Sequence, residues 1–207
     1  MKIKIKEGAM VLGVLSVTML VVTIIFGVHP LKPKAPIQSR AAMKNHNFQS
    51  KNPVLDFTFE YPEKGWQPVE AQGSIEKYDQ VYLQGPVNKE NGFTTLIHAT
   101  VRPLEVGKTA PDLLEACLKT DSNLTKFRIL HKDVKEVGRE KAFSVVYEYE
   151  SFPLFNMKAP PVLLRGQRVY LMRNGRSYEL MIETVAAQYK DYAPIFENVL
   201  KTFKFKK

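Results

Sequence analysis

The sequence predicts an α+β fold, in which a central antiparallel sheet is sandwiched between helices and is preceded by one N-terminal transmembrane helix. Three observations lead to this prediction. Residues 9–28 are continuously apolar, residues from 54 onward show strand-like and helix-like periodicity, and most strand-like segments are joined by short turns. Short connections favour antiparallel pairing, and amphipathic helices cover the faces of such a sheet, which gives an α/β/α sandwich.

Residues 9–28 carry no charge and predict a membrane-spanning signal-anchor. Twenty helical residues extend about 30 Å, which matches the hydrocarbon core of a bilayer. A cleaved signal peptide is the second interpretation, although signal-peptide cores typically run only about 7–15 residues. A buried core helix is the third, and it is disfavoured because the segment is apolar on every face.

The predicted orientation depends on the short tail before the apolar segment. Basic residues nearly balance on the two sides, with three lysines in residues 1–8 and four basic residues in 32–44. A tail of eight residues before a single span is typical of a signal-anchor with a cytoplasmic N-terminus. We therefore expect a single-pass membrane protein whose C-terminal domain is extracytoplasmic, that is periplasmic, cell-surface or lumenal.

The remaining chain divides into a linker and one domain. Residues 29–53 contain four prolines and several lysines but no apolar periodicity, which predicts a solvated tether. Residues 54–207 have the size of a single domain with its own core. The lone Cys117 excludes an intramolecular disulfide framework.

Alternating apolar residues predict the strands of this domain. The expected strands are 54–61, a short one opening at Trp66, 80–83, 93–102, 127–136, 141–150, 163–173 and 177–185. Asn174-Gly175 predicts a two-residue hairpin turn between the last two.

Two helices are predicted by their capping residues. Thr109 and Asp112 have capping-box spacing ahead of an apolar face that includes Leu113, Leu114, Cys117 and Leu118. Asp191 is the expected N-cap of the C-terminal helix. The buried face of that helix is predicted to hold Tyr192, Phe196, Val199, Leu200 and Phe203.

Several ordered motifs in residues 54–205 are shared with a known family. They are Phe57-x-Phe59-x-Tyr61-Pro62-x-x-Gly65-Trp66, the Thr-x-Pro-Asp helix start, Gly138-x-x-x-Ala142 leading to Tyr147-x-Tyr149, and Asn174-Gly175-Arg176-Ser177-Tyr178 before the final helix. This set resembles the PsbP family, which includes the extrinsic P subunit of photosystem II and bacterial envelope paralogues. The resemblance implies the sandwich fold and an accessory role. It implies no site residues, because the family's metal-binding residues have no counterparts that can be matched here.

No catalytic or cofactor motif is recognisable, so we expect a protein that is not an enzyme and that holds no cofactor or metal. The four histidines show no metal-ligand spacing, and no Gly-x-Ser-x-Gly elbow is present. Cys117 is expected to pack as a small hydrophobe, and Glu148 and Glu150 to lie on an outward polar strand face. A metal site assembled from distant residues remains an open alternative.

The net charge of +9 is explained either by solubility or by attraction to an acidic partner or surface. Basic residues gather at the C-terminus and along the last hairpin, but no nucleic-acid motif accompanies them, so no nucleic-acid partner is expected. The segment Phe152–Val162 is apolar and proline-rich, which predicts either a cover for the core or a contact with a partner or membrane. The predicted contact residues are Phe152, Leu154, Phe155, Met157, Arg165 and Arg168.

Together these observations predict a membrane-anchored extracytoplasmic PsbP-like interaction module without enzymatic activity. It would assist the assembly or stability of a membrane or envelope protein or complex, with photosystem-related complexes among the candidates. The alternatives are an envelope domain that binds a small ligand or a metal ion, and an unrecognised hydrolase.

Overall fold

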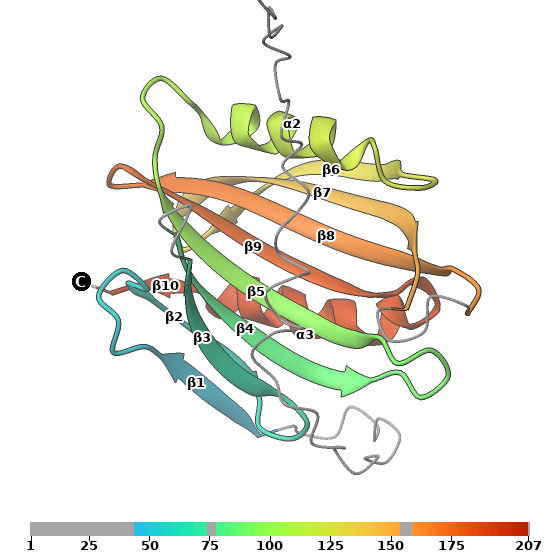
Figure 1. Ribbon diagram of the computed structural model, residues 1–207. Coiled ribbons are helices and arrows are strands. Elements are labelled where there is room, and N and C mark those ends of the chain that lie inside the picture. The colour runs from blue at the N-terminus through green and yellow to red at the C-terminus, as the bar shows by residue number, and fades with distance from the viewer. Residues whose placement is uncertain (1–43, 74–77, 154–158, 207) are drawn as a thin grey trace, which may run out of the picture. The chain divides into compact units, whose positions relative to one another are not determined.

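A seven-stranded antiparallel sheet organises the residues that this computed structural model describes, which are 44–73, 78–153 and 159–206 (Figure 1). The strand order is β3-β4-β5-β9-β8-β7-β6, and all neighbours pair antiparallel. The strands are β3 (Gln67–Gly73), β4 (Tyr78–Val87), β5 (Thr94–Pro103), β6 (Arg128–Val137), β7 (Glu140–Ser151), β8 (Val162–Arg173) and β9 (Arg176–Val185).

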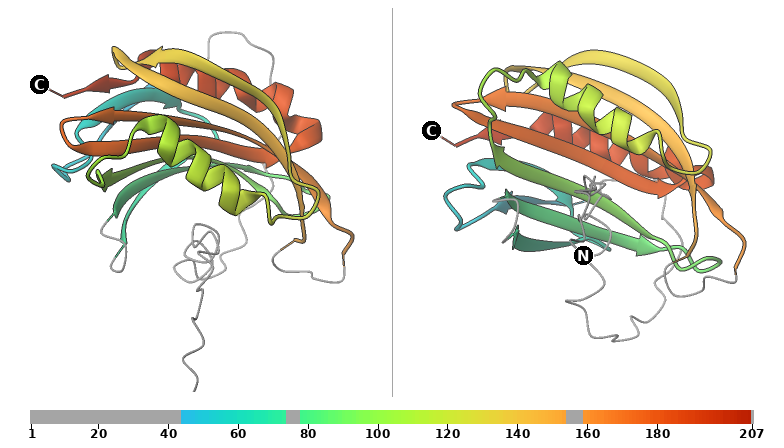
Figure 2. Two further views of the ribbon diagram at one scale, coloured as in Figure 1. Left: turned by 90° about the horizontal axis from the view of Figure 1, so that it is seen from above. Right: turned by 45° about the horizontal axis from the view of Figure 1, so that its top comes forward.

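Helices and a small second sheet cover the two faces of this sheet. Helix α2 (Ala110–Asp121) packs on β7 and β8, and α3 (Tyr189–Thr202), which follows the 3-10 turn Ala186–Gln188, packs on the opposite face beside β9 (Figure 2). The small sheet has the order β1-β2-β10 and joins α3 on that face. Its strands are β1 (Asn45–Gln49), β2 (Phe57–Pro62) and β10 (Lys204–Phe205).

The main core lies between the large sheet and the layer formed by α3 and β2. Phe57 stacks on Phe203 with ring centroids 5.0 Å apart and meets Tyr178 of β9 edge-on. Phe196 and Val199 of α3 are fully buried in the same cluster. Burial of each such side chain contributes roughly 1.5–3 kcal/mol, so this layer is the main source of the domain's stability.

Helix α2 begins where its capping residues predict. The Thr109 backbone N–H donates to the Asp112 carboxylate at 2.8 Å, and the Asp112 N–H donates back to the Thr109 hydroxyl at 3.4 Å. This capping box satisfies two N–H groups that an uncapped helix leaves unpaired. Leu114 and Leu118 then fall on the buried face of α2.

The strands predicted from the sequence are confirmed within a few residues at each end. The turn at Asn174-Gly175 has positive φ at both residues, 49° and 71°, as a type I′ hairpin requires. The sandwich of two helices on an antiparallel sheet is therefore the architecture of the described residues.

The start of the domain differs from the prediction. Strand β1 lies inside segment 29–53, which the sequence predicts as a tether, and it pairs with β2. Phe48 is buried 4.9 Å from the ring of Phe59, and the Asn52 side chain donates to Asp79 at 2.6 Å. A single buried residue in a polar strand gives no periodic signal, which is why the pattern pointed to a linker.

The C-terminal helix also begins differently. Its N-cap is Gln188, which makes no side-chain capping bond, and Asp191 lies in the first turn instead. A carboxylate in the first turn still interacts favourably with the helix dipole. The predicted buried face is confirmed, with Phe203 buried directly after the helix ends.

The predicted transmembrane segment 9–28 lies outside the described residues. Among the residues that are described, no helix combines the length and apolarity needed to cross a bilayer.

Gly166 provides a test of the packing between β8 and β7. A Cβ at this position would lie 2.5 Å from the ring and the hydroxyl of the fully buried Tyr147. We expect Gly166→Ala to lower the free energy of unfolding by about 1–3 kcal/mol, measured by urea denaturation. The cost should shrink in a Tyr147→Leu background, and an equal cost in both backgrounds would contradict this packing.

Candidate functional site

The α2 face of the sheet contains a buried ionic group that we call the Arg168 cluster, formed by Asp121, Arg168 and Glu179. The Arg168 Nη1 donates to the Asp121 carboxylate at 2.7 Å, and its Nε lies 3.0 Å from a Glu179 oxygen. All three side chains are buried. The Arg168 guanidinium also lies 5.3 Å from the centre of the Tyr147 ring, a cation–π distance.

The two carboxylates of the cluster respond differently to burial. Burial raises the pKa of Asp121 despite the nearby Arg168. Burial also opposes ionisation of Glu179, but the positive charges of Arg168 and Arg102 outweigh it and hold the pKa of Glu179 below its usual value. Glu179 therefore stays ionised at neutral pH and helps to balance the charge of the buried Arg168.

His98 of β5 lies beside this cluster. It is only 4% exposed, faces Tyr82 of β4 with ring centroids 5.8 Å apart, and its Nε2 has no hydrogen-bond partner within the described structure. Burial lowers the pKa of His98 to about 4, against a smaller opposing effect of Glu179. The imidazole is therefore neutral at physiological pH.

Cys117 of α2 is half-buried, and its Sγ lies 3.0 Å from the Tyr170 hydroxyl. Burial raises the pKa of this thiol. A protonated thiol is a poor nucleophile, so Cys117 packs as the sequence predicts and shows no sign of activation. Among the described residues, no group of three or more His, Cys, Asp or Glu side chains is placed to hold a metal ion.

The opposite face carries a second charged group at the end where β7 stops and β8 begins. Glu148 of β7 is completely buried and accepts hydrogen bonds from Arg128 Nε at 2.8 Å and Arg165 Nε at 2.7 Å. The prediction of an outward polar face at Glu148 is therefore wrong. Its flanking strands β6 and β8 each supply a guanidinium that encloses it.

This arginine pair keeps Glu148 ionised. Burial opposes ionisation, but the hydrogen bonds from Arg165 and Arg128 hold the pKa of Glu148 below its usual value. Arg165 also stacks over the Tyr189 ring at 5.3 Å. The guanidinium of Arg165 is thus fixed in orientation while remaining partly exposed.

Two exposed apolar side chains lie at the same end of β7 and β8 as these arginines. Phe152, directly after β7, is 47% exposed, and Leu163, near the start of β8, is 37% exposed. The pairing of Ser151 with Val162 brings these two strand ends together. We refer to Arg128, Phe152, Leu163 and Arg165 as the β7–β8 rim.

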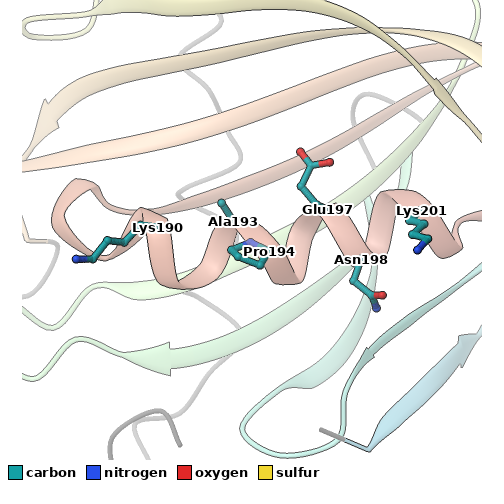
Figure 3. A pocket seen from close by; sticks show the side chains of 6 residues that line it. All are labelled: Lys190, Ala193, Pro194, Glu197, Asn198 and Lys201. Atoms are coloured by element: carbon teal, nitrogen blue, oxygen red, sulfur yellow. The ribbon is translucent and has the colours of Figure 1, made fainter. Parts of the chain in front are cut away.

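A shallow hollow on the outer face of α3 has a different character. Figure 3 shows its side chains distributed along the helix rather than converging on one point. Glu197 there already accepts hydrogen bonds from Lys135 and Gln167, both at 3.1 Å. The hollow is lined by Lys190, Ala193, Pro194, Glu197, Asn198 and Lys201. Its open form gives no argument for a ligand site.

Comparison with solved structures identifies the fold. Cyanobacterial PsbP (CyanoP) from Synechocystis sp. PCC 6803 matches with a TM-score of 0.54 and 11% identity, over 83% of this chain and 98% of that one. The domain has a PsbP-like fold. The Ran-binding protein Mog1p of Saccharomyces cerevisiae matches with a TM-score of 0.51 and 10% identity, over 79% and 96% of the two chains.

No protein-family model matches the sequence, and no curated protein matches it. The identities of the two structural matches are so low that the likeness shows the fold alone. Because these neighbours carry different descriptions, the function of the PsbP-like domain must be argued from its own residues.

The predicted contact residues separate in the structure. Phe152 and Arg165 lie together on the β7–β8 rim, whereas Leu154, Phe155 and Met157 fall outside the described residues. Arg168 points to the opposite face of β8 and belongs to the buried cluster. Sequence reasoning missed Glu148 and Arg128 as parts of one group, because only strand register brings them together.

Removing the Arg168 guanidinium tests the buried cluster. Arg168→Met leaves the buried Asp121 without its ion-pair partner and leaves Glu179 paired with Arg102 alone, so we expect it to lower the free energy of unfolding by about 3–5 kcal/mol. Arg173→Met is a matched control on the same strand, because Arg173 and its partner Glu140 are partly exposed, and it should cost about 1 kcal/mol or less. If chemical denaturation shows that the two variants lose equal free energy of unfolding, the structural role of the Arg168 cluster is contradicted.

The buried His98 predicts a loss of stability in acid. Since its pKa is lower in the folded state than in the unfolded state, its contribution is complete above about pH 6.5 and is lost as the pH falls toward 4. The loss amounts to about 3 kcal/mol from a shift of this size. His98→Gln should reduce the slope of a plot of the free energy of unfolding against pH in this window. His131→Gln, at an exposed position of β6, should leave that slope unchanged. An unchanged slope in His98→Gln would contradict this prediction.

Proposed function

We propose that the chain is a membrane-anchored, extracytoplasmic PsbP-like interaction module that has no enzymatic activity and assists the assembly or stability of a membrane protein or complex. The observation that carries this proposal is the β7–β8 rim. There, two exposed apolar side chains, Phe152 and Leu163, lie at the same strand ends as two arginines whose orientation is fixed by hydrogen bonds to Glu148.

The composition of the rim is that of a protein-binding surface. Arginine and aromatic side chains, phenylalanine included, are enriched at protein–protein interfaces relative to the rest of the surface. Immobilising a flexible side chain on binding costs about 0.5–1.5 kcal/mol. Glu148 and Tyr189 already hold Arg165 before any partner arrives, so much of this cost is avoided. An acidic group on the partner, placed beside an apolar contact, would complement the rim.

The membrane component of the proposal rests on the uncharged segment 9–28. The non-enzymatic component is supported by the protonated state of the Cys117 thiol and by the full engagement of Glu148 with two arginines. Groups in these states are poor candidates for a nucleophile or a general base.

The double variant Phe152→Ser/Leu163→Ser tests the rim directly. Loss of two exposed apolar contacts should reduce partner capture at least about tenfold in co-purification of the full chain from native membranes. Val106→Ser is the matched control, because Val106 is fully exposed in the loop before α2 and lies outside the rim. Both variants should stay folded with a cooperative thermal transition, because neither Phe152, Leu163 nor Val106 belongs to the hydrophobic core.

Undiminished capture by the folded rim variant would refute the rim as the docking surface. An equal loss of partner capture in the rim variant and in the Val106→Ser control would also refute it.

A further inference from the structure

Strand β6 forms an open edge of the large sheet. Within the described residues it pairs with β7 and with no other strand, and it continues for ten residues (Figure 2). Apart from Lys135 and Val137 its residues are exposed, and Val134 in the middle is 52% exposed. A long edge strand of this kind is a template for pairing with another strand.

The backbone of β6 is oriented for such pairing at Val134. The Val134 N–H donates to the side chain of its own neighbour Asp133 at 2.7 Å. In an antiparallel ladder, successive residues direct their N–H and C=O groups alternately to one neighbour and to the other. Val134 therefore faces outward, and so do Lys132 and Glu136 two residues to either side.

We propose that β6 pairs antiparallel with β6 of a second copy of this chain, with Val134 opposite Val134 on a two-fold axis. In this register Lys132 lies opposite Glu136 of the partner subunit, and Asp133 lies opposite Lys135 of the partner subunit. The symmetry repeats both pairs, so four oppositely charged pairs flank one apolar pair. Each such cross-strand pair contributes roughly 0.2–1 kcal/mol.

Charge complementarity selects this register over the neighbouring ones. Outward-facing residues must meet outward-facing residues for the backbone bonds to form. Within Lys132–Glu136, which follows the register irregularity between Ile129 and His131, the other symmetric registers that meet this condition are centred on Lys132, Asp133, Lys135 or Glu136, and each places two identical charges directly opposite one another. Like charges in that position destabilise the pair. Val134 is the uncharged residue among these five.

The side chains of β6 already point to the faces that this pairing needs. Lys132 bonds Glu115 of α2 at 2.6 Å, and Lys135 bonds Glu197 of α3 at 3.1 Å, so the two lysines lie on opposite faces of the sheet. By alternation, Glu136 shares the face of Lys132, and Asp133 shares the face of Lys135. Each predicted pair therefore forms on one face.

A groove beside α2 would receive the central contact. Val134 lines this groove together with Pro111, Leu114 and Phe143, and the polar residues Glu115, Lys132, Asp133 and Ser144 complete its lining. A two-fold axis normal to the sheet places both α2 helices on one face and both α3 helices on the other. The two Val134 side chains then meet between the grooves of the two copies, and the two sheets join into one.

This pairing leaves the β7–β8 rim available. Val134 is six residues along β6 from Arg128, which corresponds to roughly 20 Å at the usual rise per residue. A dimer through β6 would therefore present two copies of the β7–β8 rim. The proposed dimer is additional to the proposed docking function and does not depend on it.

Cysteine crosslinking tests the register in the full chain, reconstituted in lipid nanodiscs, with Cys117→Ala as the background. Directly opposed residues of a hydrogen-bonded pair have Cα atoms about 5.5 Å apart, which suits a disulfide. Val134→Cys should therefore give a covalent dimer under mild oxidation. Lys132→Cys is the matched control on the same edge, because its two copies would be offset by about four residues, roughly 14 Å. We expect at least tenfold more crosslinked dimer from Val134→Cys, and equal yields would overturn the register.

A charge exchange tests the same pairing without a covalent bond. Lys132→Glu would place like charges opposite Glu136 twice, so it should raise the dimer dissociation constant at least fivefold in sedimentation equilibrium in detergent. The double variant Lys132→Glu/Glu136→Lys should restore the wild-type constant. A wild-type chain that stays monomeric at every concentration would overturn the proposal, and so would a double variant that dimerises as weakly as the single one. A monomeric wild-type chain is also the result expected if the strand of another protein occupies this edge.

Discussion

Aromatic packing between β2, the C-terminal segment and β9 is the interaction on which the rest of the domain depends. Phe57 and Phe203, from the two ends of the domain, stack at 5.0 Å over Tyr178 of the central sheet. This contact fixes α3 on the sheet, and the first residue of α3, Tyr189, in turn supports Arg165 of the β7–β8 rim. The β7–β8 rim is therefore positioned by the core.

The two faces of the sheet achieve stability by different means. The face under α3 is closed mainly by apolar residues, whereas the α2 face buries Arg168 with two carboxylates and the neutral His98. A buried ion pair of this kind contributes little net stability but becomes very costly when one partner is removed. It therefore fixes the position of α2, through Asp121 at its C-terminal end, more than it strengthens the fold.

Long strand-like segments and turn signals allowed most of the fold to be predicted, because β8 and β9 run for ten residues or more on either side of the Asn174-Gly175 turn and α2 carries a capping box. Strands β1 and β10 were missed because they are short and bury few side chains. The site was less predictable. Phe152 and Arg165 were predicted as contact residues from composition, which stays a prediction, whereas the grouping of Glu148 with Arg128 and the burial of Arg168 depend on which strands are neighbours. Register is set by long-range packing, which local sequence does not encode.

In-cell crosslinking with mass spectrometry on native membranes tests the central claim most directly, by comparing the full chain with residues 1–53 alone. If the PsbP-like domain is an interaction module, a specific membrane or envelope protein will be captured by the full chain and not by residues 1–53. If the two capture the same proteins, or if the full chain captures none specifically, the claim that this domain binds a partner is contradicted.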